Sequence, residues 1–378
     1  MIHIKKASDF PKPIANSTDS TPIGVLQDIA QNVRIKSDFC IEHPKYKPFE
    51  PPVEIVKRLQ QLPIETRNKY LSQQLQSFLY GIYYNGSLTE ELLSDRDINT
   101  LVPKRDLENN TWAGIDREFY QQLHTSNSGK GYFDWGWQVV GIDDRDGSLI
   151  VAKNGLTLHM EIDPNDKERF TQLIGNGSIY VRLPKNKIQN GFYVAVGNAG
   201  LYSSNTQNGS QDIVRIYFNL TSQGAPKILN SLTEQLNKAF IPFNFKTLYN
   251  PDDYSKRCDC AVLYFNKENY GVIKQVLKSI YLKHQAHFQD KIPLFTKMLA
   301  TGLALAEEPA QKFSEQESFG QNRCQIIANG LLEAEQQKID NLQARVATII
   351  NSFSSLKIDP EHPYLNANSE NIYTNLDL

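Results

Sequence analysis

Residues 212–265 read DIVRIYFNLTSQGAPKILNSLTEQLNKAFIPFNFKTLYNPDDYSKRCDCAVLYF. Apolar and polar residues alternate around Arg215, around Lys246 and over residues 257–265, so each of these segments is predicted to be a strand. Between the first two, apolar residues recur at helical spacing from about Pro226 to Phe240. Strands and a helix in this order predict an α+β fold built on a mainly antiparallel, twisted sheet flanked by helices.

Side chains alternate between the two faces of a strand. Arg215, Tyr217 and Asn219 therefore share one face of their strand, and Lys246 is presented by the strand that follows the helix. In the third strand the same parity puts Arg257 and Tyr264 on opposite faces unless a bulge intervenes. The pattern predicts a polar and aromatic sheet face on which a lysine lies beside an Arg-x-Tyr row.

The composition limits the classes of partner. The chain has 378 residues, with 40 Lys+Arg against 42 Asp+Glu and a formal net charge of -2. Proteins that bind nucleic acid or acidic membranes usually carry a basic excess, so neither partner is expected. No apolar stretch has the length of a signal peptide or a spanning helix, so a cytoplasmic protein is expected. The four cysteines do not form a disulfide framework, and Cys258 and Cys260 are expected to be buried thiols.

Changes in composition predict three regions. Residues 1–128 show mostly helical periodicity after a mobile start, and bundle packing accounts for them without a chemical constellation. Residues 129–352 are predicted to form the α+β domain, in which further helices begin near Glu268 and at Ser318, the last of them long. Residues 353–378 are polar and are expected to be a flexible tail.

A hairpin is predicted over residues 148–162. Asn154 and Gly155 supply the positive φ angles of a type I′ turn between two alternating segments. His159 lies opposite the apolar row of the second segment. A histidine in such a place is usually structural, and we keep it only as a reserve for a catalytic acid.

The same stretches carry a resemblance to a known family. Over roughly residues 130–335 the chain resembles the HopA family of bacterial type III effectors and its relatives in natural-product clusters. Those relatives are taken as lyases of phosphoserine and phosphothreonine in class V lanthipeptide and thioamitide pathways. The residues that carry the resemblance are Asp134 to Trp137, Lys153 to Leu156, Arg215 to Asn219, Pro242 to Lys246, Arg257 to Tyr264, Pro293 to Glu308 and Ser318 to Arg323.

The resemblance implies a lyase that eliminates phosphate from phospho-Ser/Thr residues of a ribosomal precursor peptide and leaves dehydroamino acids. More distant phosphothreonine lyases show the same order of residues, with a histidine where this chain has Tyr217. The implied α-proton base is Lys246. The implied proton donor is Tyr217, with Tyr264 and His159 as reserves. The implied ligands of the phosphate are Arg215, Arg257 and Arg323. No metal or organic cofactor is needed for this reaction. The implied partners are a phosphorylated precursor peptide with a leader and a separate Ser/Thr peptide kinase.

The chemistry of these residue types agrees with such roles. A lysine becomes a base when burial or neighbouring cations disfavour its ammonium, and the fork of an arginine matches a phosphate dianion. General acid assistance to a leaving group is worth roughly 10²–10⁴ in rate. If Lys246 is not the base, Lys185 and Lys297 are the next candidates.

The same residues also have ordinary explanations. An arginine on a strand commonly pairs with a carboxylate such as Asp212 or Asp259, and a lysine on an outer strand face is commonly solvated. A non-enzymatic effector or peptide-binding module is therefore the alternative function. A kinase or phosphatase is disfavoured, because the chain has neither the kinase motifs nor a Cys-x5-Arg loop.

Overall fold

The computed structural model describes residues 21–36, 39–93, 111–112, 114–201 and 213–378. Its centre is a seven-stranded antiparallel sheet in the order β10-β11-β13-β14-β12-β16-β15, which confirms the predicted α+β class. The strands are β10 (Asn186–Gln189), β11 (Phe192–Val196), β12 (Ile213–Phe218), β13 (Asn244–Leu248), β14 (Ala261–Asn266), β15 (Lys297–Ala300) and β16 (Leu303–Glu307).

The alternation read from the sequence locates three of these strands. The strands with Arg215 and Lys246 lie where the pattern predicts them, joined by helix α7 (Gly224–Lys238). The third begins at Ala261, four residues later than predicted, because the 3-10 helix η5 (Pro251–Ser255) and the loop after it occupy the preceding residues. Arg257 is therefore a loop residue, and strand parity does not determine where its side chain points.

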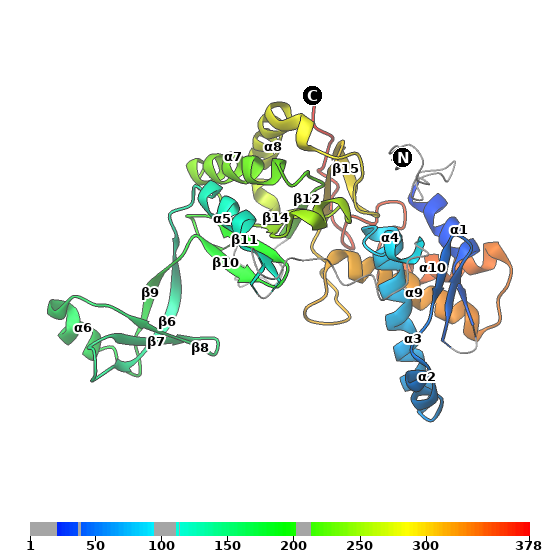
Figure 1. Ribbon diagram of the computed structural model, residues 1–378, viewed down its shortest axis with the longest axis horizontal. Helices are drawn as coiled ribbons and strands as arrows, with labels where there is room; N and C mark the ends of the chain where they lie inside the picture. Colours follow the sequence, from blue (N-terminus) through cyan, green and yellow to red (C-terminus); the bar gives the residue numbers. More distant parts are fainter. Residues whose placement is uncertain (1–20, 37–38, 94–110, 113, 202–212) are drawn as a thin grey trace, which may run out of the picture.

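One face of the central sheet is apolar and covered by helices. On this face Tyr193 packs against Tyr120 of α5 (Arg117–Ser126), with 5.2 Å between ring centroids. Phe218 packs against Phe288, which follows α8 (Tyr270–His284) and η7 (Gln285–His287). Figure 1 shows α5, α7 and α8 grouped on the same side of the sheet. The opposite face carries Arg215, Tyr217, Lys246 and Tyr264, and we call it the site face.

A second sheet projects from the body as an arm, which we define as residues 132–183 (Figure 1). Its order is β8-β7-β6-β9, and η4 (Pro164–Asp166) and α6 (Lys167–Thr171) lie between β8 and β9. The predicted hairpin is confirmed, with φ of 51 at Asn154 and 77 at Gly155. The arm has its own small core, made of Trp137, Val139, Leu149, Val151 and Val181. Its strands are β6 (Tyr132–Ile142), β7 (Leu149–Lys153), β8 (Leu156–Met160) and β9 (Ser178–Leu183).

The N-terminal region is helical, as predicted, but it also contains short strands that the sequence did not reveal. A three-stranded sheet, β1-β2-β3, lies between the first two helices, and β4 pairs with β5 near α5. The helices are α1 (Pro22–Asn32), α2 (Val53–Gln60), α3 (Ile64–Leu79), the π-helix η2 (Tyr80–Tyr84) and α4 (Thr89–Leu93). The strands are β1 (Arg34–Ile35), β2 (Ile41–His43), β3 (Tyr46–Phe49), β4 (Thr111–Trp112) and β5 (Ile115–Asp116).

The predicted long C-terminal helix is two helices. α9 (Phe319–Gln336) ends before Lys338, which has a φ of 55, and α10 (Leu342–Ser355) begins after the cap that Asn341 provides to the amide of Ala344. The left-handed residue and the cap turn the chain back, so the two helices pack against each other.

The tail that was expected to be flexible packs against the body. Tyr364, Leu365, Tyr373 and Leu376 are all less than a tenth exposed. The amide of Leu376 donates to the carbonyl of Leu299 on β15 at 2.9 Å, so the chain end continues along that edge strand. Scattered apolar residues in a polar segment are enough to fix it once a receiving surface exists, and that surface is not visible in the sequence.

Candidate functional site

The register of the central sheet brings the predicted residues together. Residues directly opposite in adjacent antiparallel strands share a face. Tyr264 of β14 lies opposite Arg215 of β12 and opposite Asn244 of β13. Val262 lies opposite Tyr217 on one side and opposite Lys246 on the other. Two neighbouring rows on the site face therefore hold an arginine, two tyrosines and a lysine.

Lys246 lies between two aromatic rings. Its ammonium is 4.7 Å from the ring centroid of Phe192 on β11 and 5.4 Å from that of Tyr264. The side chain is partly buried, and within the described residues it makes no hydrogen bond and no ion pair. It is thus a cation held by rings, whose three N–H groups are left for a ligand or solvent.

Arg215 is buried and paired with a carboxylate. Its Nε and Nη2 bond Glu308, which also accepts from Lys312 at 2.6 Å. Its guanidinium lies 5.0 Å from the centroid of the Tyr264 ring. Burial disfavours the charged guanidinium, but Tyr264, Tyr217 and Glu308 outweigh burial and hold the pKa of Arg215 well above its usual range.

Arg257 reaches the same face from the loop before β14. Its guanidinium lies 5.8 Å from the centroid of Phe192, the ring that also faces Lys246. Its Nε and Nη2 donate to the two carboxylate oxygens of Asp259 at 2.6 and 2.7 Å. Burial works against its charge, yet Asp259 raises the pKa of Arg257 above its usual range. The carboxylate pairing expected as the ordinary explanation is thus present here, whereas Asp212 lies outside the described residues.

The two candidate proton donors differ in access. Tyr217 is buried beneath Tyr84 of η2 and Phe319 of α9, and its hydroxyl has no hydrogen-bond partner among the described residues. Burial, partly opposed by Arg215, raises the pKa of Tyr217 to about 12, so the phenol is protonated near neutral pH. Tyr264 is only partly buried and faces Lys246 directly. Tyr264 is therefore the donor candidate closer to the lysine.

Arg323, predicted as a phosphate ligand, instead anchors the chain end. It is completely buried, with Nε bonded to the carbonyl of Pro363 at 2.7 Å and Nη2 to that of Leu365 at 3.0 Å. Its Nη1 donates to Asn322 at 2.5 Å. Burial lowers the pKa of Arg323 to about 10. The guanidinium is directed into the tail, so we do not include Arg323 in the phosphate site.

The remaining sequence candidates lie elsewhere. His159 is on the arm, bonded to Ser148 and close to Asp143, and it belongs to no catalytic group with Lys246. The ammonium of Lys185 is bonded to the carbonyls of His124 and Asn127 at 3.0 and 2.7 Å.

Cys258 and Cys260 are buried free thiols, as predicted, and burial raises the pKa of both. Among the described residues no group of His, Cys, Asp and Glu is arranged to hold a metal ion. None of the helices in the described part of the chain is both long and apolar enough to cross a membrane.

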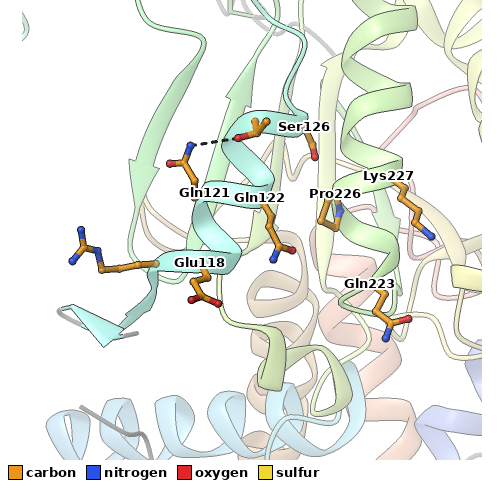
Figure 2. A pocket seen from close by; sticks show the side chains of 9 residues that line it. Glu118, Gln121, Gln122, Ser126, Gln223, Pro226 and Lys227 are labelled. Atoms are coloured by element: carbon orange, nitrogen blue, oxygen red, sulfur yellow. Dashed lines mark hydrogen bonds between the residues drawn. The ribbon is translucent and has the colours of Figure 1, made fainter. Parts of the chain in front are cut away.

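A cavity elsewhere in the structure does not contain these residues. A cavity of about 950 Å³ lies between α5 and the start of α7, and Figure 2 shows Glu118, Gln122 and Ser126 on one side with Pro226 and Lys227 on the other. Its lining consists mostly of glutamine, serine and threonine side chains with a few isolated charged residues, and it does not bring two cations to one point. A smaller cavity of about 200 Å³ is lined by Tyr80 and Gln321 among others. We place the candidate site on the site face because its cations and rings converge there.

Sequence reasoning missed Phe192 and Glu308 as members of the site. Phe192 is 54 residues before Lys246 along the chain, and its position depends on the pairing of β11 with β13. Glu308 follows β16, whose pairing with β12 brings it to Arg215. Only the order of the strands in the sheet could have placed these two residues in the site, and the alternation of residues along a strand does not reveal that order.

The central sheet lies in a part of the chain that matches a known protein family. Residues 183–365, which contain the whole central sheet and α9, match the model of the HopA1 effector protein family. An effector protein from Pseudomonas syringae pv. tomato strain DC3000 has a similar structure, with 18% sequence identity and a TM-score of 0.38 over 66% of this chain and 81% of that chain. An effector protein from Pseudomonas syringae pv. syringae strain 61 shows 15% identity and a TM-score of 0.41 over 80% of this chain and 98% of that chain. No curated protein matches the chain.

Proposed function

We propose, starting from the match of residues 183–365 to the HopA1 effector protein family, that this chain is a lyase that eliminates phosphate from phosphoserine and phosphothreonine in a peptide. The observation that carries the proposal is the position of Lys246. It is a lysine without an ion pair among the described residues, and two arginines face the same pair of rings as its ammonium.

In the proposed reaction the ammonium of Lys246 first gives a proton to solvent, and the resulting amine takes the α-proton of the phosphorylated residue. The electron pair of the broken Cα–H bond forms the Cα=Cβ double bond, and the Cβ–O bond breaks with its electrons on the leaving phosphate oxygen. The products are a dehydroamino acid, inorganic phosphate and a protonated lysine. The step needs no oxidant, nucleotide or metal.

Arg215 and Arg257 are the proposed phosphate ligands. Their carboxylate partners bond the Nε–Nη2 edge of each guanidinium, so the donors of Nη1 lie on the other side. A phosphate placed between them and Lys246 would receive hydrogen bonds from both arginines. Such bonds stabilise the negative charge that grows on the leaving group in the transition state.

Tyr264 is the proposed proton donor to the leaving oxygen, and Tyr217 is the second candidate. Tyr264 faces both Lys246 and Arg215, so a single phosphoresidue can contact all three. The phenol of Tyr217 lies deeper, beside Tyr84.

The substrate that we propose is a ribosomally made precursor peptide with a leader, as in lanthipeptide-type maturation in the cytoplasm. A separate Ser/Thr peptide kinase would supply the phosphorylated residue.

Mass spectrometry of a phosphothreonine peptide after incubation with the protein tests this proposal. We expect loss of phosphoric acid, which leaves a dehydro residue, and not hydrolysis to the free hydroxyl. Lys246→Ala should lower the elimination rate by about 10²–10⁴ with binding largely retained, since the base acts only in the transition state. Lys246→Arg should bind the peptide and not turn over, because arginine stays protonated at accessible pH.

Lys297→Arg is the matched control. Lys297 also lies 5.4 Å from a tyrosine ring, that of Tyr364, but on the edge strand β15 of the sheet. Its replacement should leave elimination unchanged. Turnover near the wild-type level in Lys246→Arg would remove Lys246 as the base.

A second function is favoured by the carboxylates. Because Glu308 and Asp259 already pair with Arg215 and Arg257, the site face also suits a module that binds phosphorylated or acidic peptides without chemistry. Tight binding of the phosphopeptide that leaves its mass unchanged after long incubation would support this non-enzymatic alternative and overturn the lyase.

A further inference from the structure

A second lysine lies on the site face in line with the first. Lys187 of β10 is opposite Val194 of β11, and Val194 is opposite Lys246 of β13. The row continues through Val262 to Tyr217. Adjacent strands are about 4.8 Å apart, so the backbones of Lys187 and Lys246 are separated by about 10 Å across the sheet.

The root of the arm meets the sheet at Lys187. Its ammonium is 5.9 Å from the ring centroid of Tyr132, the first residue of β6. The Lys187 side chain is exposed, but desolvation by its neighbours lowers its pKa, with Asp134 acting to raise it and Lys153 to lower it, so all three side chains share one region. The hydroxyl of Tyr132 is buried there without a hydrogen-bond partner among the described residues.

The carboxylate of Asp134 already has two hydrogen-bond donors in this region. Asp134 accepts from Trp137 at 2.7 Å and from Lys153 at 2.8 Å, and Lys153 also donates to the carbonyl of Trp135. Lys187 therefore has no ion pair of its own among the described residues. Two lysines against one carboxylate leave a net positive charge at the root of the arm.

We propose that Lys187, supported by Lys153, is a second anion subsite that binds an acidic or phosphorylated side chain of the same peptide. The inference rests on the proposed function of Lys246. A peptide in the polyproline II conformation rises about 3.1 Å per residue and has three residues per turn, so side chains three residues apart point the same way. Their separation of about 9 Å is close to the roughly 10 Å between the two lysines. The subsite would select peptides with a negative charge three residues before or after the reacting phosphoresidue.

The surface between the two lysines is suited to such a path. Val194 forms its floor and adds no charge or polar group. A peptide that crosses the strands there can place one anion at each end without desolvating an intervening ionic group.

Peptide pairs that differ only at the third residue test the subsite. Phosphothreonine peptides with Glu at position −3 or +3 are compared with their Gln counterparts, by fluorescence anisotropy and by elimination rate. We expect one of the Glu peptides to bind about 3- to 10-fold tighter than its Gln partner at low salt. Lys187→Gln should abolish this preference, and Lys187→Glu should reverse it in favour of Lys at the same position.

Lys167→Glu is the matched control, because it makes the same charge change on α6 of the arm, outside the row. It should keep the wild-type preference. Equal binding of Glu and Gln peptides to the wild-type protein, or an unchanged preference in Lys187→Glu, would overturn the subsite. Absence of elimination with every peptide would overturn only the lyase, since the anisotropy comparison still decides the subsite.

Discussion

Arg323→Met should destabilise the fold and release the C-terminal tail. Arg323 is completely buried and donates to the carbonyls of Pro363 and Leu365. Methionine retains the unbranched stem that packs on Phe319, but it leaves both carbonyls without donors. The substitution therefore distinguishes two roles of Arg323, that of an anchor of the tail and that of a ligand of phosphate.

The magnitude follows from the groups left unpaired. A buried acceptor that loses its partner costs about 1–3 kcal/mol, and two are orphaned here. Part of this cost is offset, because methionine does not require the desolvation of a charge. The free energy of unfolding should fall by about 3–5 kcal/mol, which is a large part of the total for a marginally stable protein.

Urea unfolding followed by tryptophan fluorescence measures this loss, and hydrogen exchange locates it. Exchange should rise in residues 359–376 at urea concentrations well below the global transition. Arg345→Met is the matched control, because Arg345 is also buried and bonds the carbonyls of Ala30 and Val33, both at 2.9 Å. It should destabilise the protein and loosen α1, without added exchange in the tail.

If Arg323→Met unfolds within about 1 kcal/mol of the wild type, keeps the tail protected and loses phosphopeptide affinity, its guanidinium is a ligand of phosphate. The structure would then describe a state in which the tail occupies the place of the substrate.

Three further predictions concern packing and ionisation. Gly320→Ala should cost about 1–3 kcal/mol in urea unfolding, because a Cβ there would lie 2.4 Å from the ring of Tyr84. Gly155→Ala should cost about 1 kcal/mol, seen as faster exchange in the arm hairpin alone, because φ is +77 in open space. Burial raises the pKa of the Cys258 thiol well above its usual range and that of the Cys260 thiol to about 12, so Ellman's reagent at pH 8 should label them only after unfolding. The unfolded thiols ionise near pH 8.5, so their contribution to stability should be lost as the pH rises above about 8.5.

Local patterns identified the strands with Arg215 and Lys246, helix α7 and the Asn154-Gly155 hairpin. Each depends on alternation, helical spacing or turn residues within about 15 positions. The break between α9 and α10 was missed, because apolar spacing continues past Lys338 and no glycine or proline marks its left-handed backbone. The tail was missed for a related reason, since its apolar residues are sparse and need a surface formed by distant segments.

The residues of the site could largely be predicted from the sequence, but the ion pairs among them could not. Alternation placed Arg215 and Tyr217 on one face with Lys246 beside them, and the resemblance supplied their roles. In the structure the register brings them into adjacent rows. The sequence could not show which carboxylate pairs with which arginine. Arg323 shows the limit most clearly: the resemblance suggested a phosphate ligand, and in the structure its guanidinium donates to backbone carbonyls.

The carboxylates on Arg215 and Arg257 change how a phosphate would be held. Each pair has no net charge, so its attraction for a dianion comes from directed hydrogen bonds more than from Coulomb energy. The pairing also fixes the guanidinium, so binding need not restrict an otherwise mobile side chain, whose rotamer entropy is about 2 kcal/mol. Net positive charge comes from Lys312, which shares Glu308 with Arg215, and from Lys246 and Lys187, which have no ion pair among the described residues. Salt should therefore weaken capture of the peptide, while the arginines determine how accurately the phosphate is oriented toward the lysine.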